Sequence, residues 1–129
     1  MLRTLSDKPH VLVVDDDLST REVLNLLLTS EGFGVATAGD GVAALQQLRR
    51  GEHPGLILLD LMMPLMDGWQ FRQEQLRDPR LADIPVIVCS ASARVDQRVD
   101  GLQALAYLDK PVDPTELMAL VRRCYPHLP

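Results

Sequence analysis

The chain alternates between short apolar runs and longer segments in which apolar residues recur at helical spacing. The apolar runs are rich in β-branched and aliphatic side chains. Such runs are typical of strands that are buried on both faces of a parallel sheet. The predicted strands are 10–15, 33–38, 56–60, 85–90 and 105–109.

The segments between these runs predict helices. Asp40 is a candidate N-cap for a helix that closes before Gly51. Asp113, Pro114 and Glu116 offer the last helix an N-cap, a first-turn proline and a capping-box acid. The first helix places four apolar residues on one side: Val23, Leu24, Leu27 and Leu28. The predicted helices are 18–31, 41–50, 68–77, 93–103 and 114–125.

Strands and helices that alternate in this way predict a doubly wound α/β fold with right-handed crossovers. The carboxyl ends of its parallel strands share one edge of the sheet, and such folds bind ligands there. Four of the apolar runs lead into residues suited to phosphate or metal chemistry: Asp15 and Asp16, Asp60, Ser90, and Lys110. We therefore expect these residues to converge on one crevice.

Size and charge narrow the function classes. The 129 residues predict one domain, with a short extension over 1–8, a folded unit over 9–125 and a tail over 126–129. The net charge of −5 argues against nucleic-acid binding. No apolar stretch reaches membrane-spanning length, and the first ten residues lack the apolar core of a secretion signal. The two cysteines fit no metal-binding or redox spacing, so we expect a soluble, cytoplasmic protein.

The acids of the crevice predict a cation site. Asp15 or Asp16, together with Asp60, would bring two or three carboxylates close together, and their repulsion raises pKa values. Mg²⁺ relieves this repulsion, because it prefers one or two carboxylates with waters and phosphate oxygens. An Asp at a strand end also starts turns and caps helices, and this is the reading we favour for Asp17.

Asp60 stands alone at the end of the central predicted strand. A carboxylate can attack phosphorus and form an acyl phosphate. In-line transfer then needs positioning and neutralisation of the phosphoryl oxygens, to which Lys110 would add charge and Ser90 a hydrogen bond. Taken singly, Ser90 could be a core-edge residue and Lys110 a solvated surface charge, but together with Asp60 they form a coherent set.

The chain contains, in this order, the segments VLVVDDD, LILLDLMMPLMDGW, IPVIVCSAS and AYLDKPVDPTEL. Through these four segments it resembles the receiver domain of two-component response regulators, and in particular the single-domain, chemotaxis type, in which the order and spacing of such segments are the same. The resemblance covers 9–125, which would be the receiver domain. It implies a flavodoxin-like, three-layer αβα sandwich around a five-stranded parallel sheet with strand order 2-1-3-4-5.

The resemblance also implies roles for individual residues. Asp60 would be the phosphoacceptor, with Mg²⁺ held by Asp15, Asp16, Asp60 and the backbone carbonyl of Met62. The remaining implied roles are phosphate binding by Lys110 before a cis Pro111, switching by Ser90 and Tyr107, and tuning of hydrolysis by Met62 and Ser92. Phosphorylation would shift the surface formed by 91–113 and so alter partner binding.

The implied protein is a signalling receiver that assists its own phosphorylation and dephosphorylation, not a turnover enzyme. Its phosphodonor would be a sensor histidine kinase or a histidine phosphotransfer protein, and its downstream target a protein that the sequence does not identify. We expect no direct nucleic-acid contact and no membrane insertion. The chain would be a monomer or a weak dimer through the 91–125 face.

Two other function classes stay open. The segment 15–19 superficially resembles the nucleophile motif of haloacid-dehalogenase-type phosphatases, yet those enzymes usually need a longer chain, and this reading leaves Asp60 unexplained. A phosphatase would turn over more than one phosphate per chain. The second alternative is an interaction module that is never phosphorylated, and such a module would not respond to small phosphodonors.

Overall fold

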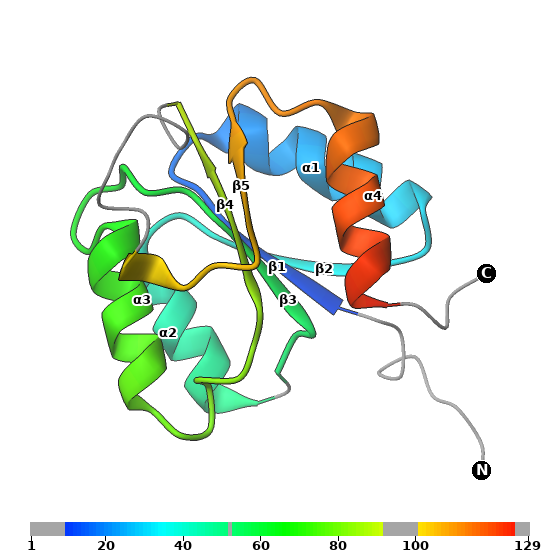
Figure 1. The fold of residues 1–129 in the computed structure, drawn as a ribbon. Helices are drawn as coiled ribbons and strands as arrows, with labels where there is room; N and C mark the ends of the chain where they lie inside the picture. Colours follow the sequence, from blue (N-terminus) through cyan, green and yellow to red (C-terminus); the bar gives the residue numbers. More distant parts are fainter. Residues whose placement is uncertain (1–9, 52, 92–100, 126–129) are drawn as a thin grey trace, which may run out of the picture.

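The structure is a computed structural model that describes residues 10–51, 53–91 and 101–125. A five-stranded, fully parallel sheet with strand order β2-β1-β3-β4-β5 forms its centre (Figure 1). The strands are β1 (His10–Val14), β2 (Gly34–Ala38), β3 (Leu56–Leu59), β4 (Val86–Ser90) and β5 (Ala106–Asp109). The predicted fold class and strand order are confirmed.

Helices cover both faces of the sheet. They are α1 (Leu18–Ser30), α2 (Gly41–Arg50), α3 (Gly68–Arg77) and α4 (Pro114–Cys124). Helices α1 and α4 lie on one face, and α2 and α3 lie on the other (Figure 1). Alternate residues of β1 and β3 point into these two apolar layers, as the two-residue period of a strand requires. The domain is therefore the three-layer sandwich expected.

Each described helix begins at an aspartate. The carboxylates of Asp17, Asp40, Asp67 and Asp113 accept backbone N–H groups from the first turns of α1, α2, α3 and α4. Asp67 and Gln70 form a complete capping box. Because these caps follow the carboxyl ends of strands, they fix where each chain segment leaves the crevice. The capping reading of Asp17 is confirmed.

Two predicted details differ from the structure. In α1, Leu24 and Leu28 are buried, but Val23 is 62% exposed. Successive helical residues are rotated by about 100°, so Val23 turns away from the sheet while its neighbour faces it. The predicted helix over 93–103 falls largely outside the described residues, and at its described end Gln103 has a left-handed backbone with φ 54°.

The two cysteines lie in the apolar core or pack against it. Cys89 is buried in the layer that faces α1 and α4, Cys124 is half-buried, and both are free thiols. Burial raises the pKa of Cys89 to about 12. Every helix in the described part of the chain falls short of the length and apolar character needed to span a bilayer.

Candidate functional site

The ends of β1 and β3 bring the acidic residues together. Asp15 follows the last residue of β1, and its backbone N–H donates to the carbonyl of Ala38 at 3.0 Å. Asp60 follows β3, and its backbone N–H donates to the carbonyl of Val14 at 2.9 Å. These bonds continue the sheet ladder one residue beyond the strands. Both carboxylates are therefore attached to rigid backbone.

Three carboxylates form one cluster at this edge. Oxygen atoms of Asp15, Asp16 and Asp60 all lie within 4.8 Å of one another. Asp15 and Asp60 are buried, whereas Asp16 is exposed at the mouth. An all-oxygen set with an open side suits Mg²⁺, which takes few protein carboxylates and keeps positions for water or phosphate. The donor set of this cluster therefore fits the expected ion.

Lys110 reaches this cluster from the end of β5. Its Nζ lies 2.6 Å from Oδ2 of Asp15 and 3.6 Å from Oδ2 of Asp60. Its backbone N–H donates to the carbonyl of Ser90 at 3.0 Å, and the Lys110–Pro111 peptide bond is cis. Ser90 is buried at the end of β4. The structure thus brings all four predicted segments to one crevice.

Burial and charge perturb the ionisation of the two central groups. Burial, followed by the charge of Asp15, raises the pKa of Asp60 to about 6, although the charge of Lys110 lowers it. Burial alone would lower the pKa of Lys110, but the hydrogen bond and charges of Asp15 and Asp60 outweigh it and raise that pKa. Lys110 is therefore protonated, and it lies beside a carboxyl group whose ionised form is disfavoured.

The loop after β3 approaches Asp60 closely. The N–H of Met62 donates to Oδ1 of Asp60 at 3.4 Å, while the Met62 side chain is 68% exposed and so is not the packing group that its apolar character suggests. A Cβ on Gly68 would lie 2.5 Å from the carbonyl oxygen of Asp60 and 2.7 Å from Cα of Leu61. Only glycine leaves room for this loop to fold back on the strand end.

Roles were also expected for Tyr107 and Ser92. Tyr107 is half-buried and packs against the core layer under α2 and α3. Its hydroxyl accepts the N–H of Ala104 at 3.4 Å. Ser92 lies outside the described residues. The proposed roles of Tyr107 and Ser92 therefore stay predictions.

Arg21 is a cation of this site that sequence reasoning missed. Its Nη1 donates to the backbone carbonyl of Asp15 at 2.7 Å and would approach a Cβ on Gly39. The guanidinium therefore braces the loop between β1 and α1. The available signal was an arginine one turn into the helix after the acids, but nothing local shows that it folds back.

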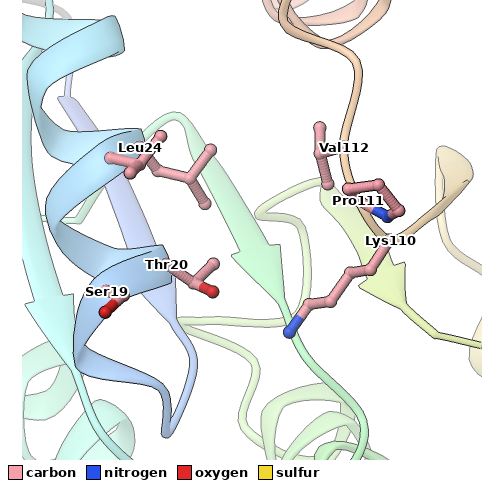
Figure 2. Close-up of a pocket in the computed structure, with 7 residues that line it drawn as sticks. Ser19, Thr20, Leu24, Lys110, Pro111 and Val112 are labelled. Carbon is pink, nitrogen blue, oxygen red and sulfur yellow. The ribbon is translucent and has the colours of Figure 1, made fainter.

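An apolar groove opens beside Lys110. Figure 2 shows α1 on one side of this groove and the 110–112 segment on the other. The groove has a volume of about 510 Å³. Its walls are formed by Ser19, Thr20, Val23, Leu24, Lys110, Pro111 and Val112. Val23, exposed against expectation, forms part of this wall. The groove gives the acidic crevice an apolar neighbour at the molecular surface.

Comparisons with known proteins agree on one family. The family model of the response regulator receiver domain matches residues 11–122. A curated relative from Porphyridium aerugineum, "Probable transcriptional regulator ycf27", is 41% identical over 117 residues, which are 89% of this chain and 47% of the relative. The chain spans about half the length of the curated relatives it matches.

Solved structures agree with the family match. The response regulator receiver protein from Pseudomonas putida is 34% identical with a TM-score of 0.83, and the match covers 90% of this chain and 97% of that one. The receiver domain of sensor histidine kinase PA1611 from Pseudomonas aeruginosa is 26% identical with a TM-score of 0.82, covering 90% of this chain and 96% of that one. In that structure a magnesium ion is coordinated in the active site cleft.

Proposed function

The chain belongs to the response regulator receiver domain family, and from this premise we propose that it accepts a phosphoryl group on Asp60. Receiver domains are signalling modules of two-component systems and not turnover enzymes. One observation supports Asp60 above all. It is a buried carboxylate at the end of a central strand, and both the acid cluster and Lys110 lie within reach of it.

The proposed reaction is transfer from a phosphohistidine of a sensor kinase or a histidine phosphotransfer protein. The bond between phosphorus and the histidine nitrogen breaks while a bond from an Asp60 oxygen to phosphorus forms, and the electron pair stays on the imidazole. Because the pKa of Asp60 stands at about 6, its carboxylate is ionised and nucleophilic at neutral pH. Lys110 and Ser90 would then hold the phosphoryl oxygens.

The charge balance explains why Mg²⁺ belongs to this proposal. Asp15, Asp16 and Asp60 carry three negative charges, against which Lys110 and Arg21 bring two positive charges to this edge. A phosphoryl group adds about −1.5 to −2 to this excess. Bound Mg²⁺ supplies two positive charges next to the phosphoryl oxygens. The three carboxylates and the carbonyl of Met62 would hold the ion.

The proposed output is a local repacking that starts at the phosphoryl group. Ser90 would move toward the new acceptor oxygens, and Tyr107 would rotate into the space it leaves. The surface formed by 91–113 would change with it, of which 92–100 lie outside the described residues. Met62 and Ser92 would flank the acyl phosphate and tune its hydrolysis.

The groove beside Lys110 supports an apolar contact with the phosphodonor. A donor histidine must reach Asp60 through the open side of the crevice, so the protein that carries it must also cover the neighbouring surface. Val23, which is exposed, and Val112 both line the groove and offer that protein an apolar contact. Figure 2 shows Val112 across the groove from α1. We propose that the donor packs here.

The binding partners, cellular compartment and oligomeric state of the chain are also proposals. The Porphyridium relative is named as a transcriptional regulator and is about twice as long as this chain. We therefore do not assign the function of that whole protein to this chain. The net charge of −5 supports a protein partner, with no direct nucleic-acid contact by the receiver itself. Free Cys89 and Cys124 support a reducing, cytoplasmic setting. We propose a monomer or a weak dimer through the 91–125 face.

The phosphatase alternative finds less support. Its nucleophile motif would need Asp15 and Asp17 free for substrate. Asp17 instead accepts the N–H of Ser19 at 3.1 Å and the hydroxyl of Thr20 at 2.7 Å, while Asp15 pairs with Lys110. Both acids are therefore engaged in helix capping or ion pairing.

Intact mass after incubation with acetyl phosphate and Mg²⁺ tests the proposal. We expect one phosphoryl group per chain, on the peptide that contains Asp60, and no label when EDTA removes the ion. Asp60→Asn should abolish the label. Asp17→Asn is the matched control, because it removes an acid at the same edge while keeping a good N-cap. Label that survives Asp60→Asn, or turnover beyond one phosphate per chain, contradicts the assignment.

A further inference from the structure

The inner face of α3 carries two polar side chains that the phosphoryl chemistry does not use. Arg72 is only 5% exposed and Gln75 is fully buried, and both share the inward stripe of the helix with Phe71. Burying a guanidinium costs free energy unless its N–H groups are hydrogen-bonded. Burial also lowers the pKa of Arg72 from its ordinary value. The partners of these two side chains therefore indicate what they do.

Arg72 binds the turn that leads into β5. Its Nε donates to the carbonyl of Leu102 at 2.8 Å, and its Nη2 donates to the carbonyl of Gln103 at 3.0 Å. Figure 1 shows this yellow segment beside α3. Gln103 is in the left-handed region, where a side chain other than glycine costs free energy. The guanidinium thus holds a backbone turn that the chain does not favour by itself.

Gln75 orients the guanidinium. Its Oε1 accepts from Nη1 of Arg72 at 2.7 Å, and its Nε2 donates to the carbonyls of Leu81 and Ile84 at 3.0 Å each. Leu81 and Ile84 precede β4, just as Leu102 precedes β5. One buried network therefore ties the entries of both strands to α3.

The same turn contacts the aromatic ring of the proposed switch. The N–H of Ala104 donates to the hydroxyl of Tyr107 at 3.4 Å, and the Tyr107 ring packs against the core layer that contains Phe71. Rotation of Tyr107 toward Ser90 would take the hydroxyl away from this N–H. The bond can therefore form only while the ring lies toward the turn.

We propose that Arg72, oriented by Gln75, is a positioning residue that holds Tyr107 in its resting position and so sets how readily phosphorylation switches the domain. The inference rests on the proposed function, because it takes rotation of Tyr107 as the switch. Without Arg72, the turn no longer presents the Ala104 N–H, and the resting position loses a hydrogen bond. The equilibrium then shifts toward the rotated state, and that state binds a phosphoryl mimic more tightly.

Calorimetric titration with beryllofluoride and Mg²⁺ tests this inference. Arg72→Leu should tighten the apparent affinity about 3- to 10-fold, which is the effect of losing one net hydrogen bond in the resting state. Tyr107→Phe should tighten it to a similar degree. The double variant should gain no more than either single variant, because Tyr107→Phe removes the bond from the Ala104 N–H and Arg72→Leu acts through that same bond. Phe71→Leu is the matched control, since it removes core volume on the same helix face but leaves the network intact.

The outcomes separate this inference from its premise. Unchanged or weaker binding in Arg72→Leu, or effects that add in the double variant, overturns it. An affinity gain in Phe71→Leu equal to that of Arg72→Leu also overturns it, because loosened packing would then suffice. If Arg72→Leu does not fold, Tyr107→Phe decides alone, and unchanged affinity in that variant refutes the inference. Wild-type protein that fails to bind beryllofluoride would instead refute the proposed function.

Discussion

Replacing Asp60, the proposed phosphoacceptor, should stabilise the protein in the absence of Mg²⁺. Burial and the charge of Asp15 raise the pKa of Asp60 from 3.8 to about 6, so its ionised form is disfavoured in the folded state. A shift of about two units corresponds to about 3 kcal/mol at most. Because the crevice opens to solvent at Asp16, we expect screening to leave about 1–2 kcal/mol. Asp60→Asn keeps the shape of the side chain and removes this penalty.

The gain in stability that Asp60→Asn brings must increase as the pH rises. A carboxyl whose folded-state pKa is raised stabilises the fold most when it is protonated, and this contribution is lost as the pH rises from 3.8 through about 6. Asp60→Asn cannot lose a proton there. Its advantage over the wild type should therefore be full above pH 7 and nearly absent at pH 4.

Urea unfolding of both proteins in EDTA, followed through Trp69 fluorescence, measures this difference. At pH 7.5 we expect a gain of about 1–2 kcal/mol, or about 4–8 °C in a thermal scan. Mg²⁺ at ten times its Kd should stabilise the wild type by about 1.4 kcal/mol. The variant, which lacks one of the proposed ligands, should gain less, so the difference between the proteins should narrow.

Asp17→Asn provides the control, because the pKa of Asp17 is shifted in the opposite direction to that of Asp60. The hydrogen bond from Thr20 lowers the pKa of Asp17, so its charge is favourable in the folded state, and removing that charge should bring no gain at neutral pH. An Asp60→Asn protein no more stable than the wild type at pH 7.5, or equally stabilised at pH 4, would show that the crevice does not disfavour the Asp60 charge.

Other substitutions probe the geometry of the site and of the opposite end of the sheet, where the strands begin. Lys110→Ala should lower the free energy of unfolding by about 1–3 kcal/mol, because it leaves the buried carboxylate of Asp15 without the cation that pairs with it. The variant should still bind Mg²⁺, as titrated through Trp69 fluorescence, but should no longer respond to beryllofluoride. Gly68→Ala should cost about 2 kcal/mol or more and reduce labelling by acetyl phosphate, because its Cβ would meet backbone atoms of the Asp60 loop; unchanged labelling would count against close packing there. Gly55→Ala should destabilise the fold through a clash with the Tyr125 hydroxyl, and Tyr125→Phe in the same chain should recover part of the loss in thermal scans.

The sheet was predictable because its signals are local. The runs at 11–14, 56–59 and 86–89 are apolar throughout, and each lies buried on both faces of the sheet. Asp15 and Asp60 follow two of these runs directly, so parallel strand direction alone implies that the two carboxylates meet. Their convergence follows from the topology and needs no knowledge of side-chain contacts.

What sequence reasoning missed depends on contacts made across the fold. Val23 and Leu24 are both apolar, and only the sheet position decides which of them is buried. Arg72 and Gln75 look like the polar face of α3, yet both point inward, because carbonyl groups of distant turns need donors there. Arg21 is likewise placed by a backbone oxygen six residues earlier in the chain. No periodicity in the sequence encodes such partners.

The position of β5 explains why a switch would act on that side of the sheet. Strands β3 and β4 are buried throughout and hydrogen-bonded on both edges, so moving either would disturb two ladders and both core layers. Among the described residues, β5 is an edge strand that pairs with β4 alone, and it is only partly buried. It holds Lys110 just past its carboxyl end, and the Arg72 network holds the turn that enters it. In the proposed switch, a phosphoryl charge on Asp60 would therefore pull Lys110 at one end of a strand that only one ladder holds, while the Arg72 network would resist at the other end.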